Sequence, residues 1–183
     1  MTVSEYLKQN TAHFHDAAEE KFNSKKIFSK TFTPDDYRNI IRSNYRMLHD
    51  AENEIFRILA PRFGEKLQFD ARRKLSFIEK DAESLKLKKL EADSGLKFKN
   101  EYEALGAMYV IEGSTLGGNV IAKQLSKTEG FEEVTFHFFG FYREKTSEMW
   151  KNFKEVLDAE VDETHYAEVL NGANTLYRHL LAD

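Results

Sequence analysis

Four glycines within one predicted helix constrain the fold of this 183-residue chain more than any other feature. The segment 100–127 has the periodicity of a helix, yet it contains Gly106, Gly113, Gly117 and Gly118. A glycine inside a helix costs about 1 kcal/mol relative to alanine, so packing or function must offset the penalty. At 3.6 residues per turn, the first three lie on one stripe and the fourth lies beside it. We therefore expect a flat or bulky group, or a closely packed helix, to lie against this stripe.

Apolar residues recur at steps of three and four over most of the chain, which predicts an all-α fold, a compact bundle of six or seven helices. Thr33 followed by Pro34 is a strong start signal for a helix. Asn100 with Glu103 reads as a capping box for the glycine-rich helix. The expected long helices cover residues 4–22, 34–60, 70–88, 100–127, 146–161 and 162 to near the end, with Asp70 capping the third. The aromatic segment 131–142 lacks a partner strand and is expected to be an ordered loop.

Composition limits the classes of protein to which the chain can belong. The net charge of −4 and the lack of a lysine- and arginine-rich stripe argue against a nucleic-acid partner. No cysteine is present, so disulfides and thiolate metal sites are excluded. The sequence has no apolar run of membrane-spanning length, and its first residues are polar, so we expect a cytoplasmic protein with no membrane partner. Residues 1–183 show neither a linker nor a repeat, which favours one domain, and the oligomeric state stays open.

The histidines are the side chains most suited to bind a metal or move a proton. His13 and His15 are two residues apart, so on a helix they point in different directions and cannot bind one ion together. His15 adjoins the apolar face of the first helix. It is either a half-buried histidine satisfied by a carbonyl or by Glu19, or an axial ligand to heme iron with Glu19 accepting from its other nitrogen. Three histidines in polar or terminal surroundings are expected to be solvated: His49, His165 and His179.

Two motifs resemble those of the heme oxygenase family. The segment 11–19, TAHFHDAAE, resembles the proximal-helix pattern, and the segment 109–118, YVIEGSTLGG, resembles the distal-helix signature, especially of the bacterial branch. The resemblance extends to Phe138-Phe139 and to the helix with Trp150 and Phe153. It implies a heme oxygenase-type helix bundle that holds heme between the first, proximal helix and a kinked, glycine-rich distal helix.

The resemblance also assigns residues on both faces of the heme. It implies that His15 is the proximal iron ligand and that Gly113 and Gly117 pack over the distal face, with Gly118 beside them. Ser114 stands where many family members have an aspartate that organises distal water, so the group that holds this water is left open.

Lys8 and Lys151 resemble the positions that contact the heme propionates. Lys8 precedes His15 by two helical turns, so both side chains can lie on one side of the helix. Met108 occupies a position that is tyrosine in the animal enzymes. The alternative for each lysine is a solvated surface residue.

The resemblance implies that heme is both cofactor and substrate. Heme, dioxygen and reductant would give biliverdin or a related linear tetrapyrrole, carbon monoxide and ferrous iron. Because no glycine loop for flavin or nicotinamide follows a strand, the electrons are expected from a separate ferredoxin or flavin reductase. Two alternatives stay open: a heme-storage or sensing protein of the same fold, and a non-heme di-metal site that recruits Glu112, His49 and Glu52.

Overall fold

The computed structural model describes residues 1–87 and 95–182, which form the all-helical bundle that the sequence predicts. Its α-helices are α1 (Val3–Lys21), α2 (Lys25–Phe28), α3 (Pro34–Phe63), α4 (Leu75–Ser84), α5 (Glu101–Leu125), α6 (Thr146–Glu160) and α7 (Tyr166–Leu181). In this described part of the chain, short 3-10 turns lie at Phe69–Ala71, Arg143–Lys145 and Glu163–His165. None of the helices in the described portion is long and apolar enough to cross a membrane.

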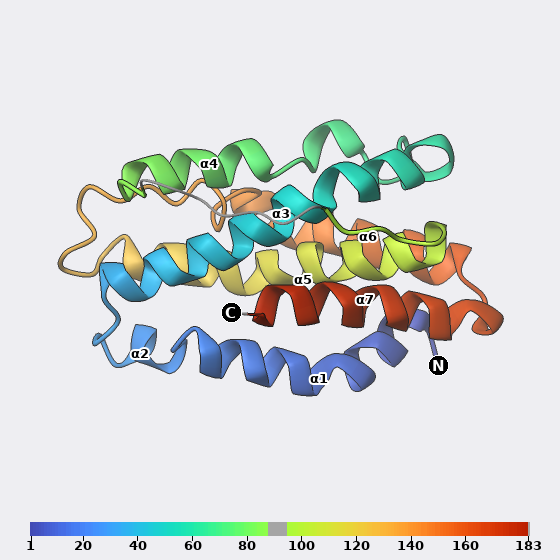
Figure 1. Ribbon diagram of the computed structural model, residues 1–183, viewed down its shortest axis with the longest axis horizontal. Coiled ribbons are helices and arrows are strands. Elements are labelled where there is room, and N and C mark those ends of the chain that lie inside the picture. The colour runs from blue at the N-terminus through green and yellow to red at the C-terminus, as the bar shows by residue number, and fades with distance from the viewer. Residues whose placement is uncertain (88–94, 183) are drawn as a thin grey trace.

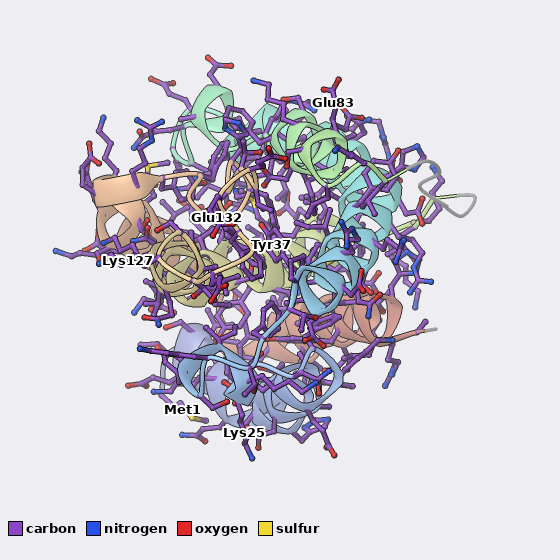
Figure 2. The ribbon with its side chains drawn as sticks, turned by 90° about the vertical axis from the view of Figure 1, so that its left-hand side faces the viewer. Met1, Lys25, Tyr37, Glu83, Lys127 and Glu132 are labelled. Carbon is purple, nitrogen blue, oxygen red and sulfur yellow. The ribbon has the colours of Figure 1, made fainter. Side chains whose placement is uncertain are left out.

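The glycine-rich helix α5 runs through the middle of the molecule. It packs against α3, α6 and α7, while α1 packs against α7 and α6. In Figure 1, α3 and α4 lie on one side of α5, and α7 and α1 lie on the other. Figure 2 shows the same order from the end of the bundle, with α1 below α5. Helices α1 and α5 therefore share α7 as a common packing partner.

The start of α3 confirms the predicted cap, but its predicted end is wrong. The Thr33 hydroxyl accepts from the N–H of Asp36 at 3.2 Å, and the Asp36 carboxylate accepts from the N–H of Thr33 at 3.0 Å. The helix then continues through Pro61 to Phe63 instead of stopping before the proline. A proline in the last turn removes only one backbone hydrogen bond, and the N–H of Gly64 still closes the turn on the Ala60 carbonyl at 3.2 Å.

The start of α4 corrects the prediction that Asp70 caps this helix. Asp70 lies in a 3-10 turn, and α4 begins at Leu75. The cap comes from α3, because the Glu52 carboxylate accepts from the N–H of Lys74 at 2.6 Å and of Leu75 at 3.3 Å. Burial raises the pKa of Glu52, although these two donors oppose the effect. The predicted end of this helix near residue 88 is also wrong, because α4 ends at Ser84 and residues 85–87 are not helical.

Asn100 caps α5 as predicted, with its side-chain oxygen 3.1 Å from the backbone nitrogens of Tyr102 and Glu103. The second half of the predicted capping box is wrong. The Glu103 carboxylate accepts from the N–H of Lys99 at 2.8 Å instead of returning to Asn100. The cap and the surrounding apolar contacts nevertheless start the helix at the expected residue.

The aromatic segment 131–142 is an ordered loop, as expected, and α4 holds it in place. The buried Asp81 carboxylate accepts from the N–H groups of His137 and Phe138, both at 2.8 Å, and from the Thr135 hydroxyl at 2.9 Å. Burial raises the pKa of Asp81, and these donors oppose the rise. Phe139 follows directly, so Asp81 positions its ring for contact with α5.

Candidate functional site

Two of the four glycines in α5 are required by contacts within the protein. A Cβ atom at Gly106 would lie 1.8 Å from the Val169 carbonyl oxygen on α7, and one at Gly118 would lie 2.4 Å from the Phe139 ring. Real Cβ atoms do not approach so closely, so neither position accepts a side chain without a shift. The expectation that one group covers the whole stripe is therefore wrong. Gly106 lies against the α7 backbone because the two helices cross there.

The other two glycines are not required by packing among the described residues. A Cβ atom at Gly113 would lie 3.5 Å from Cη2 of Trp150, which is an ordinary van der Waals distance. A Cβ atom at Gly117 would have no described neighbour within 4 Å. The helix-propensity cost at these two positions is therefore not offset by contacts that require glycine among the described residues.

Gly113 and Gly117 belong to a partly exposed apolar face of α5, with the Trp150 ring beside Gly113. Residues 113, 116, 117 and 120 share one face of a helix, and Leu116 and Val120 have 39% and 51% of their surface exposed. Helix α2 packs against α5, and its Phe28 side chain is also exposed. Exposed apolar surface of this kind is typical of a binding site. We call residues 113, 116, 117 and 120 the open face of α5.

A hollow of about 330 Å³ continues the open face toward the C-terminal end of α5. Its lining includes Gln124, which follows Val120 by one turn and so lies on the same side of the helix. The other lining residues are Lys30, Phe32, Lys127, Thr128 and Glu129. From Gly113 to Gln124 the helix rises by about 16 Å, so a long flat molecule can lie along it.

His15 lies on α1 with 65% of its side chain exposed. Its Nδ1 atom lies 3.6 Å from Oε1 of Glu19, one turn further along the helix. The structure thus brings these two predicted residues together and leaves Nε2 as the nitrogen for an outside ligand. His13 packs its ring on Phe14 instead, with 4.2 Å between the ring centres.

The remaining predicted site residues lie at the surface or bond to their own helix. Lys8 is exposed, and the exposed Lys151 lies 3.6 Å from Oε1 of Glu155. The Ser114 hydroxyl donates to the Ile111 carbonyl at 2.8 Å. A serine in a helix commonly makes such a bond to the preceding turn.

The expectation that His49, His165 and His179 are solvated is wrong most clearly for His179. His179 is largely buried, and its Nε2 lies 2.9 Å from the Asp50 carboxylate, whose other oxygen lies 2.9 Å from Nδ1 of His49. His165 stacks on Tyr102, with 3.7 Å between ring centres. Within residues 1–87 and 95–182, no group of three histidine or acidic side chains could hold a metal ion. The di-metal alternative therefore finds no support.

A cluster of buried charged residues lies beside the open face and was not predicted from the sequence. Arg72 and Lys74 are almost fully buried and donate to the two oxygens of Glu112, the residue before Gly113. The Tyr142 hydroxyl donates to the same carboxylate at 2.8 Å. Burial lowers the pKa of Lys74, although Glu112 opposes the shift. Burial raises the pKa of Tyr142, and the negative charge of Glu112 raises it further.

One signal in the sequence could have indicated this cluster. Glu112 follows the run LGAMYVI, which contains only apolar and small residues. An acid in such a buried run needs a cation, because an unpaired buried charge is very costly. The sequence does not reveal which cation supplies it.

Comparison with known proteins agrees with this architecture. The sequence model of the family described as "Heme oxygenase" matches residues 1–181. A protein of Xanthomonas campestris pv. campestris (strain 8004) named "Heme oxygenase" is 28% identical over 146 residues, which cover 79% of this chain and 86% of that protein. The chain therefore belongs to the heme oxygenase family, whose members are all-α enzymes that cleave heme oxidatively.

Solved structures of bacterial heme oxygenases share the fold. The heme complex of heme oxygenase-1 from Synechocystis sp. PCC6803 superimposes with a TM-score of 0.73 at 12% identity, covering 99% of this chain and 90% of that one. The NO- and CO-bound enzyme from Neisseria meningitidis gives a TM-score of 0.72 at 18% identity, with the same coverage. The enzyme from Leptospira interrogans gives 0.72 at 14% identity, covering 99% and 97% of the two chains.

Proposed function

We propose that this heme oxygenase holds heme between α1 and the open face of α5 and converts it to biliverdin, or a related linear tetrapyrrole, with carbon monoxide and ferrous iron. The observation that carries the proposal is the pair Gly113 and Gly117, which are bare although described protein contacts do not require it. Leu116 and Val120 supply apolar surface beside them. Bare backbone with exposed apolar neighbours fits a flat macrocycle that approaches the main chain closely.

His15 fits the role of proximal ligand to the iron. Its ring is accessible, and a carboxylate on the Nδ1 side favours the tautomer that carries the proton on Nδ1. The lone pair of Nε2 is then available to the iron. Glu19 would orient the ring and make it a stronger donor once the present 3.6 Å separation shortens to a hydrogen bond.

Lys8 and Lys151 are proposed to hold the propionates by charge-assisted hydrogen bonds. Both side chains are exposed, so each can move to reach an anion at the edge of the heme. Lys151 would exchange its contact with Glu155, at 3.6 Å, for a propionate. An exposed ion pair of this kind contributes little stability, so the exchange costs little.

Gly113 and Gly117 are proposed to shape the distal side of the heme. Gly118, beside them, leaves room for the ring of Phe139. Bound heme supplies the iron at which dioxygen is activated. The glycines leave room over the macrocycle and bring no acid–base side chain to it. The Ser114 hydroxyl donates to the Ile111 carbonyl, so in this conformation it can hold distal water only as an acceptor. A bend of α5 at its glycines is part of the proposal.

The reaction also needs dioxygen and electrons. We propose that a ferredoxin or a flavin reductase delivers the electrons and that the protein works in the cytoplasm. The formal charge of −4 agrees with the proposed absence of a nucleic-acid partner.

A heme-storage or sensing protein could use the same ligand and the same open face, so turnover is the deciding property. The purified protein receives one equivalent of heme without oxygen, and oxygen with ascorbate is then added. Loss of the Soret band with the appearance of a bilin spectrum supports the enzyme. A stable heme spectrum under the same conditions supports storage or sensing.

A further inference from the structure

The buried guanidinium of Arg72 joins α5 to α6. Arg72 lies in the link between α3 and α4 and is 1% exposed. On one side it donates to the Glu112 carboxylate of α5. On the other side its second terminal nitrogen donates to the Met149 carbonyl at 3.1 Å and to the Asn152 side-chain oxygen at 2.9 Å, both on α6.

The two ends of this bridge adjoin the groups that face each other at the open face. Glu112 immediately precedes Gly113, while Met149 and Asn152 stand on either side of Trp150. The Trp150 ring lies 3.5 Å from the place of a Cβ atom at Gly113. The Arg72 side chain therefore bridges the two helices at Gly113 and Trp150, beside the packing of Tyr109 on Trp150, whose ring centres are 5.3 Å apart.

The other members of the cluster do not make this link. Lys74 and Tyr142 both bond to Glu112 and to each other, at 3.1 Å. Neither of them has a described hydrogen bond to α6. Arginine suits the bridging role because its rigid fork holds several acceptors in fixed directions, which a lysine cannot do.

We propose that Arg72 is a positioning residue that sets the separation of α5 from α6 at Gly113 and Trp150. This separation in turn determines how the heme is oriented in its site and therefore which meso carbon is cleaved. The proposal rests on the proposed function of the open face. Arg72 itself would not touch the heme. Its effect reaches the heme through the two helices that it joins.

The test compares R72M and R72K with the wild-type chain. In R72M, Lys74 and Tyr142 still hold Glu112, so α5 keeps its anchor while α6 loses its link. We expect the amides of residues 146–153 in the heme-free protein to exchange with deuterium at least tenfold faster. We also expect heme to bind about tenfold more weakly and the bilin product to contain more than the wild-type isomer. R72K, which keeps the charge without the fork, should behave like R72M.

Two further variants make the test independent of simple loss of stability. N152A removes one acceptor on α6 and leaves the pair of Arg72 with Glu112 intact, so it should shift the same three measurements in the same direction by less. D50N alters another buried carboxylate, which links α3 to His179 of α7. It should lower the melting temperature and leave the isomer ratio unchanged.

Wild-type exchange rates, heme affinity and isomer ratio in R72K and N152A would overturn the proposal, even if R72M failed to fold. An isomer mixture in D50N equal to that in R72K would also overturn it, because the effect would then follow stability alone. Failure of the wild-type protein to bind heme would contradict the proposed function instead. The exchange measurement on heme-free protein would still decide whether Arg72 holds the two helices together.

Discussion

Gly106 on α5 and Gly172 on α7 each leave room for the backbone of the other helix. A Cβ atom at Gly106 would lie 1.8 Å from the Val169 carbonyl oxygen, and one at Gly172 would lie 1.8 Å from the Glu103 carbonyl oxygen. The reciprocal contact fixes how closely the two helices cross. It also separates the glycines that serve packing from Gly113 and Gly117, which lie on the open face.

This separation predicts opposite effects of alanine on stability. G106A should destabilise the protein by about 3 kcal/mol or more, because the methyl group would force two backbones apart. G117A should stabilise the heme-free protein by about 0.5–1 kcal/mol, because alanine is the better helix former and nothing described lies within 4 Å. Urea unfolding followed by circular dichroism measures both. Equal losses of stability in the two variants would show that the open face is packed in solution.

The assignment of the iron ligand predicts different heme spectra for two neighbouring histidines. H15A should lose the native Soret spectrum, because the ring with the accessible Nε2 is gone. H13A should bind heme nearly as the wild type does, since His13 packs on Phe14. Absorption titration of each variant with heme makes the comparison. The reverse pattern would reject His15 as the ligand.

The contacts of Asp81 predict a structural role in holding the aromatic loop against α5. D81N should lose about 1–3 kcal/mol of stability, because an amide nitrogen would face a backbone N–H that now finds an oxygen. T135V, which removes only the hydroxyl donor at 2.9 Å, should lose about 0.5–1.5 kcal/mol. Denaturant unfolding at pH 7 compares the two. A D81N variant as stable as the wild type would contradict this role.

The ion pairs of Glu160 predict a pH-dependent part of the stability. Lys66 and Arg62 hold the pKa of Glu160 below its ordinary value of 4.5. The folded state therefore binds fewer protons than the unfolded state, so the contribution is present above pH 4.5 and is lost as the pH falls through the folded pKa. The wild type should be more stable than E160Q at pH 7, and the difference should shrink toward pH 3 and in high salt. A difference that stayed constant over this range would reject the assignment.

Features set by neighbours in the sequence were predictable, and those set by distant partners were not. Thr33 and Asn100 cap helices through residues two or three positions away, so both starts were found. Glu52 caps a helix 22 residues further along the chain, and Arg72 pairs with Glu112 across 40 residues. Lysine and arginine are almost never fully buried unless they are paired, so nothing local marked Arg72 and Lys74 as interior.

The candidate site shows the same limit at single residues. The spacing of the glycines correctly put Gly113 and Gly117 on one face, but it assigned Gly106 to the same role. The difference between them depends on the position of Val169, which lies on another helix. His15 and Glu19 were predictable as a pair because they are one turn apart.

The open face of α5 is proposed to receive heme, and titration of G117F with heme examines this proposal at a single residue. A phenyl group at this position meets no described atom at its Cβ, so the variant should fold with a melting temperature close to that of the wild type. We expect G117F to form no heme complex and to release no bilin when oxygen and ascorbate are added, because the phenyl ring would occupy the place of the macrocycle. A folded G117F that binds heme with wild-type affinity and turns it over at the wild-type rate would show that heme does not lie on the open face.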